Sequence, residues 1–129
     1  MSLYTRSKIY YSESNADGTT TGTTLITQTT DSGEYNFQPL QAYAQVTQEQ
    51  NVLTPAVVSV GTNSPNYDNI VSAKSIGGAV GMIPLQIEAD LPKIGSEIDI
   101  KVKVNTACIP NPLTTPTLEF KVIILGMEM

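Results

Sequence analysis

The segment "SEIDIKVKVN" at residues 96–105 decides the fold class, because its aliphatic and charged residues alternate without interruption. Successive side chains of an extended strand point to opposite faces, so the aliphatic positions would share one face. These positions are Ile98, Ile100, Val102 and Val104. The opposite face carries Glu97, Asp99, Lys101 and Lys103. The pattern predicts an antiparallel strand with one face in a core and the other in water.

Strand patterns also occur on both sides of this segment. Residues 40–48 alternate in the same way, and residues 117–127 alternate at first and then become apolar on both faces from Ile123 to Leu125. A strand that is apolar on both faces is expected in the centre of a sheet or at an interface. Weaker patterns occupy residues 7–13, 23–29, 56–60 and 82–88, with turn signals rich in Gly, Pro, Asn and Asp between them.

These observations predict an all-β chain, folded as a single antiparallel β-sandwich with jelly-roll-like connectivity and about seven to eight strands. Hydrophobic residues make up 40% of the sequence and charged residues 15%, which is typical of a globular protein. With 129 residues and neither an internal repeat nor a domain boundary in the sequence, one domain over residues 1–129 is expected. Residues 1–6 would form a flexible N-terminal arm.

Charge and hydropathy exclude several classes of partner. The net charge is −5, and the seven basic residues are spread along the chain, so a nucleic-acid partner is not expected. No run reaches the roughly 18 apolar residues that a membrane helix needs, and no signal-peptide pattern opens the chain. We therefore expect that the chain is made in a cytoplasm and either stays in the cytosol or enters an intracellular assembly.

The sequence has little catalytic equipment. Histidine is absent and Cys108 is the single cysteine, which excludes serine–histidine chemistry and leaves the thiol without an activating base. The segment "ESNADG" at 13–18 partly matches a calcium loop, but Thr24 stands where that loop needs glutamate, so we interpret it as a hairpin turn with Asp17 and Gly18 at its tip. We expect no enzyme, no cofactor and no metal site.

The segment "VGTNSPNYDNIV" at 60–71 crowds turn-forming residues around one tyrosine. Gly61 permits an abrupt change of direction, and Ser64 followed by Pro65 is a good start for a helical turn over residues 65–71. That turn would pack Tyr67 beside Ile70 or Val71 at one end of the sandwich. The prediction is a structural corner rather than a catalytic loop.

The longer segment "LTPAVVSVGTNSPNYDNIV" at 53–71 resembles one found in small all-β proteins encoded among the head genes of tailed bacteriophages. The resemblance extends over residues 50–129 and ends in an aliphatic strand, here "EFKVIILGM" at 119–127. Those proteins are similar to head decoration (cement) proteins, which bind the outside of an assembled capsid and hold neighbouring subunits together. The resemblance implies a virion protein on the capsid surface, made in the host cytoplasm, with the major capsid protein as partner and no catalytic residues.

Contacts with the capsid and with other copies of the chain would come from surface elements. A homo-oligomer, a trimer first of all, is expected because the contacts must pair across the local symmetry axes of a capsid. The predicted contact residues are Leu3, Tyr4, Arg6, Ile123, Leu125 and Met127. For the last three, packing in the core is the plainer explanation.

Two other functions stay open. A tail-fibre or receptor-binding module could hold a glycan on exposed tyrosine rings, for which the candidates are Tyr10, Tyr11, Tyr35 and Tyr43. A small β-sandwich hydrolase would need a metal bound to carboxylates. Glu97 and Asp99 lie two residues apart on the charged face of their strand, and we interpret that pair as ordinary solvation.

Overall fold

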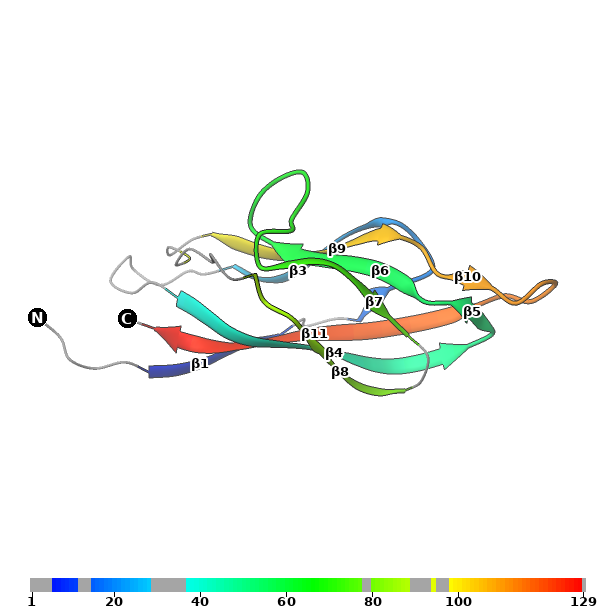
Figure 1. The fold of residues 1–129 in the computed structure, drawn as a ribbon, viewed down its shortest axis with the longest axis horizontal. Coiled ribbons are helices and arrows are strands. Elements are labelled where there is room, and N and C mark those ends of the chain that lie inside the picture. The colour runs from blue at the N-terminus through cyan, green and yellow to red at the C-terminus, as the bar shows by residue number, and fades with distance from the viewer. Residues whose placement is uncertain are drawn as a thin grey trace, which may run out of the picture.

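The computed structural model describes residues 6–11, 15–28, 37–77, 80–88, 94 and 98–128, and these form strands and connecting loops (Figure 1). The described residues contain no helix, and their strands pair antiparallel in layered sheets. The predicted all-β, antiparallel fold class is therefore confirmed. No helix in the described ranges has the length and hydropathy to cross a bilayer.

The larger sheet has five strands, in the order β1-β11-β4-β8 with β2 also paired to β11. Its members are β1 (Arg6–Tyr11), β2 (Ala16–Asp17), β4 (Phe37–Gln50), β8 (Gly81–Leu85) and β11 (Thr117–Glu128). β11 pairs with β4 along its whole length, from Thr117 opposite Gln50 to Glu128 opposite Phe37. The other edge of β11 pairs first with β2 and then with β1.

The smaller sheet has four strands in the order β3-β9-β6-β7. They are β3 (Gly22–Gln28), β9 (Asp99–Thr106), β6 (Ala56–Gly61) and β7 (Val71–Ile76). A third, two-stranded sheet joins β5 (Val52–Thr54) to β10 (Ile109–Pro110). In Figure 1 this pair lies near one extremity of the molecule, away from the start of β1 and the end of β11.

The core fills the space between the two main sheets, as the alternating sequence pattern predicts. From the smaller sheet it receives Ile100, Val102 and Val104 of β9, and from the larger sheet Leu118, Phe120, Val122 and Ile124 of β11. Ile98 was expected in the same row, but its side chain is 43% exposed because β9 begins only at Asp99.

An aromatic pair closes the end of the sandwich where β4 begins. The rings of Tyr10 and Phe37 meet edge to face with centroids 4.6 Å apart, a favourable aromatic geometry. The backbones of Phe37 and Ile94 exchange two hydrogen bonds of 2.8 Å. Gly126 lies against this pair, since a Cβ there would fall 2.6 Å from the Phe37 ring and overlap the carbonyl oxygen of Gln38.

A buried serine on the outer face of the smaller sheet joins three of its strands by hydrogen bonds. Ser59 of β6 lies opposite a bulge of β7 and is buried, and its hydroxyl oxygen accepts hydrogen bonds from both neighbouring strands. The Nδ2 of Asn105 on β9 donates at 2.6 Å, and the N–H of Ala73 on β7 donates at 3.1 Å. One hydroxyl therefore links three strands where the β6–β7 register is interrupted.

Replacing Ser59 by alanine should lower the free energy of unfolding by about 1–3 kcal/mol, because two donors lose their buried acceptor. Urea denaturation followed by circular dichroism measures the change. The matched control is Ser75→Ala, at an exposed position of β7, for which we expect a change within about 0.5 kcal/mol. Equal effects of the two substitutions would show that the Ser59 hydroxyl does not hold the sheet.

Candidate contact surface

The segment between β6 and β7 is a corner held by its own side chains. The Oδ1 of Asn63 accepts hydrogen bonds from the N–H of Asp68 at 2.8 Å and of Asn69 at 3.2 Å. The Oδ1 of Asn69 in turn accepts from the N–H of Thr62 at 2.8 Å. A Cβ at Gly61 would lie 2.8 Å from the Oδ1 of Asn63, so the corner requires glycine there.

Two lysines of β9 hold the corner against the outer face of the smaller sheet. The Nζ of Lys103 donates to the carbonyl oxygen of Pro65 at 3.0 Å, and the Nζ of Lys101 lies 5.5 Å from the centroid of the Tyr67 ring. The second distance is within the range of a cation–π contact. Lysines that the sequence pattern assigns to water are therefore half-buried beneath this loop.

The structure corrects part of the predicted corner. Residues 64–66 form one turn, closed by a 2.6 Å bond from the N–H of Tyr67 to the carbonyl of Asn63, and no helix follows. Ser64 and Pro65, joined by a cis peptide bond, are exposed, and Asn63 makes the bonds expected of the cap. Tyr67 is only half-buried, whereas Ile70 is buried as predicted, and Gly61 is buried as well. The functional groups of the corner are thus directed at one another.

Cys108 and the carboxylates do not form a reactive cluster. The Cys108 side chain is buried, and burial, together with the nearby carboxylate of Asp17, raises the pKa of its thiol. The Oδ1 of Asp17 accepts from the N–H and hydroxyl of Thr19, which confirms a turn there. The turn is not a hairpin, because β1 and β3 on either side belong to different sheets.

No group of three or more metal-ligating side chains comes together within the described ranges. Glu97 lies outside those ranges. Asp99 was expected in water, but its carboxylate is half-buried, and its Oδ1 has no hydrogen-bond partner among the described residues.

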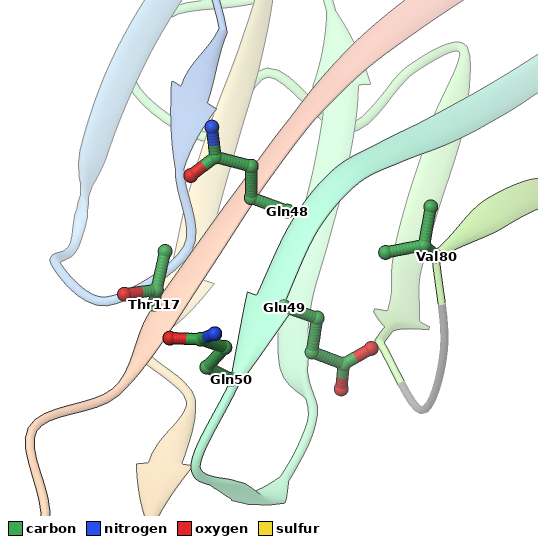
Figure 2. Close-up of a pocket in the computed structure, with 5 residues that line it drawn as sticks. All are labelled: Gln48, Glu49, Gln50, Val80 and Thr117. Carbon is green, nitrogen blue, oxygen red and sulfur yellow. The ribbon is translucent and has the colours of Figure 1, made fainter.

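A polar cleft of about 300 Å³ surrounds the end of β4 (Figure 2). Figure 2 shows Gln48 and Gln50 projecting over β11, near Thr117, while Glu49 projects on the other side of β4 toward Val80. The cleft offers amide, hydroxyl and carboxylate groups, which suit a polar ligand. Sequence reasoning missed it because the β4–β11 register shifts between Glu119 and Phe120, which changes the face on which Gln48 and Gln50 lie.

The outer face of the larger sheet carries a continuous apolar surface near the end of β11. Leu125 pairs with Ile9 of β1, and Ile123 pairs with Tyr43 of β4, which pairs with Pro84 of β8. We call this surface the apolar patch; it comprises Ile9, Tyr43, Pro84, Ile123, Leu125 and Met127. Ile9 is 54% exposed and the three β11 side chains are half-buried.

The patch is uncharged, unlike the rest of this sheet face. The positions that pair with its β11 members hold serine, isoleucine, tyrosine and glutamine, none of which is charged. Toward the start of β11, the same face bears Lys121, Glu119 and Thr117. An apolar, uncharged area on a paired sheet can bind another protein without desolvating a charge.

The predicted contact residues have different outcomes. Ile123, Leu125 and Met127 lie on the face of β11 opposite to the core, so the core-packing explanation is wrong for them. Arg6, expected in a loose arm, is the first residue of β1, with its backbone opposite Glu128. Leu3 and Tyr4 lie outside the described residues.

The tyrosine platform of the alternative function is not supported as a set. Tyr10 is 8% exposed and packs on Phe37 in the core, so its predicted exposure is wrong. Tyr43 is half-buried within the apolar patch, and its hydroxyl donates to the Oε1 of Gln41 at 3.3 Å. Tyr35 lies outside the described residues, and only the backbone of Tyr11 is described.

Comparison with known proteins assigns no family. No protein-family model matches the chain, and no curated protein matches it in sequence.

Asn63→Ala should lower the free energy of unfolding by about 1–3 kcal/mol, because the N–H groups of Asp68 and Asn69 lose their acceptor. Its neighbour Ser64 gives the control: loss of a helix cap would reduce stability by about 1 kcal/mol, whereas an exposed turn residue changes it by less than about 0.5. We expect the second result for Ser64→Ala in chemical denaturation. A larger loss of unfolding free energy for Ser64→Ala than for Asn63→Ala would instead support the predicted role of Ser64 as a helix cap.

The Cys108 thiol should resist alkylation by iodoacetamide at pH 8 in the folded protein and react fully in denaturant. Its pKa is higher in the folded than in the unfolded chain, so the folded state holds the proton more tightly. The resulting stability is present below the unfolded pKa and is lost as the pH rises toward the folded one. Cys108→Ala should therefore show a smaller loss of stability between pH 8 and pH 10 than the parent. Identical pH profiles would contradict the assignment.

Proposed function

We propose that this chain is a structural virion protein that decorates and stabilises a bacteriophage capsid by bridging subunits of the major capsid protein, as a homo-oligomer, with a trimer favoured. The observation that carries the proposal is the apolar patch on the outer face of the larger sheet. The resemblance of residues 53–71 to proteins encoded among phage head genes supplies the biological setting. The location that follows is the capsid surface.

The patch has the physical properties that such an attachment needs. It lies on strands paired to neighbours, so its side chains are held in place before binding and little conformational freedom is lost. Apolar area removed from water gives about 25 cal/mol per Å² before those losses, so a modest patch binds weakly by itself. Repetition over a closed shell, with several copies linked together, converts weak contacts into lasting attachment.

The strand orders β1-β11-β4-β8 and β3-β9-β6-β7 support jelly-roll connectivity. Setting aside the short strands β2, β5 and β10, each sheet combines two early and two late strands of the chain. Jelly rolls occur in capsid proteins and in lectins, so this fold is compatible with both functions under consideration. The choice between them depends on the surfaces.

A glycan- or receptor-binding module of a phage tail fibre is the second candidate. The polar cleft at the end of β4 favours it, because amides, a carboxylate and a hydroxyl are the groups that bind sugar hydroxyls. Of the predicted tyrosine platform, Tyr10 is buried in the core and Tyr43 lies in the apolar patch, outside this cleft. For this reason we place capsid decoration first. Neither function involves catalysis, a cofactor or a metal.

Co-sedimentation with emptied capsid shells of the phage whose genome encodes the chain tests the proposal. We expect saturable binding at a fixed number of copies per shell. Ile123→Asp or Leu125→Asp should weaken binding by at least about tenfold, because each places a charge in an apolar contact that binding would desolvate. Thermal unfolding of each variant verifies that the fold is retained.

Gln45→Asp is the matched control, since it introduces the same charge on the same sheet face outside the patch. It should bind shells like the parent. Binding to host envelope fragments instead of shells, with loss of that binding on Gln48→Ala, would favour the tail-fibre function. Failure to bind shells at any concentration tested would remove the decoration proposal.

A further inference from the structure

The connection between β10 and β11 ends in a braced, projecting tip. The N–H of Asn111 donates to the carbonyl of Asn51 at 2.9 Å, and the Nδ2 of Asn51 donates to the carbonyl of Thr115 at 3.1 Å. Within the tip, the hydroxyl of Thr114 donates to the carbonyl of Asn111 at 2.6 Å. The connection forms one extremity of the molecule, at the right of Figure 1.

Leu113 at this tip has two unfavourable properties in an isolated molecule. Its relative exposure is 106%, so the side chain buries none of its apolar surface. Its φ is 68°, in the left-handed region that a branched aliphatic residue rarely adopts. Glycine or asparagine would fit that backbone better, so neither burial nor local conformation explains the leucine.

Two further exposed aliphatic residues belong to the adjoining two-stranded sheet. Leu53 of β5 is 60% exposed and Ile109 of β10 is 51% exposed. Prolines 110, 112 and 116 restrict the same connection and limit the conformational freedom that binding would remove. We call Leu53, Ile109 and Leu113 the tip cluster.

The segments that supply the tip cluster carry no charged residue, although the chain as a whole is acidic. No charged residue occurs in residues 50–67 or in residues 104–118, the two segments that supply β5, β10 and the tip. Two copies that each carry a net charge of −5 repel one another, and the repulsion is weakest where uncharged surfaces meet.

We propose that the tip cluster is the contact between copies of this chain, with Leu113 of one copy buried against the same tip of another around a symmetry axis. The inference rests on the homo-oligomer of the proposed function and assigns its interface, which is distinct from the apolar patch that faces the capsid. A self-complementary apolar cluster suits such a contact, because copies related by a symmetry axis present the same surface to one another, and a residue near the axis meets its own counterpart. A membrane is the less favoured occupant, since no lysine or arginine adjoins the tip to attract anionic lipid.

Leu113→Asn separates a contact role from a structural one, because the two roles predict opposite results. Asparagine tolerates the left-handed backbone, so the variant should unfold at the same temperature as the parent or higher when both are monomeric at high dilution. Its oligomer should dissociate at a concentration at least about tenfold higher, as expected on removing a central apolar anchor. Sedimentation velocity over a dilution series measures the second quantity without any capsid.

The matched control is Leu25→Asn, the same substitution at an exposed leucine of β3, which should leave association unchanged. A monomeric parent at all concentrations, or an equally oligomeric Leu113→Asn, would overturn the proposal. A monomeric variant that unfolds well below the parent would do the same, since Leu113 would then be structural. None of these results depends on shell binding, which can succeed or fail independently.

Cysteine cross-linking locates the contact directly. Leu113→Cys treated with a short bismaleimide should give covalent dimers, whereas Leu25→Cys should not, and the native Cys108 is buried and should remain unreacted in both. Cross-linking of Leu25→Cys in place of Leu113→Cys would contradict the assignment. So would flotation of the parent, but not of Leu113→Asn, with phosphatidylcholine vesicles, which would make the tip a lipid anchor.

Discussion

The pairing of β11 with β4 is the constraint on which the rest of the fold depends. It joins two long strands along their full length, and β11 brings the earlier strands β1 and β2 to its other edge. The inward residues of β11 from Leu118 to Ile124 are fully buried, so they form the floor of the core. Because inward and outward positions alternate, the same pairing also fixes Ile123, Leu125 and Met127 on the outer face. The core and the apolar patch are therefore two results of one register.

The surface divides into regions with different chemistry. The outer face of the smaller sheet is covered in part by the corner at 61–70, which is bound by Lys101 and Lys103 and leaves few polar groups available. The outer face of the larger sheet is apolar at one end and polar at the other. The tip cluster adjoins the polar end, where Asn51 follows Gln50 and donates to the carbonyl of Thr115, and lies away from the apolar patch. The proposed bridging role needs more than one such surface, since a decorating protein must hold a shell and a neighbouring copy together.

Local sequence pattern predicted the strands whose two faces differ clearly in polarity. It failed where the inner and outer faces are defined only by strand pairing and by packing between the sheets. The alternation in residues 96–105 specified β9 and its buried side chains. β7 was missed because the bulge opposite Val58 and Val60 and the left-handed backbone of Ala73 break its alternation. In the corner, Asn63 and not Ser64 accepts hydrogen bonds from the following N–H groups, because the path of the chain brings the N–H groups of Asp68 and Asn69 to the Asn63 side chain. For Ile123 to Leu125, apolar residues on both faces left the inner face undefined until the second sheet was placed.

The position of β11 in the sequence also determines when the molecule can fold during translation. The ribosome makes residues 117–128 after every strand with which they pair, so a nascent chain without them leaves β1, β2 and one edge of β4 unpaired. Pairing between distant segments is slow, and an unpaired apolar strand edge invites contact with other chains. Folding of this sandwich is therefore completed only after β11 has been made, and the nascent chain exposes an unpaired apolar strand edge until then.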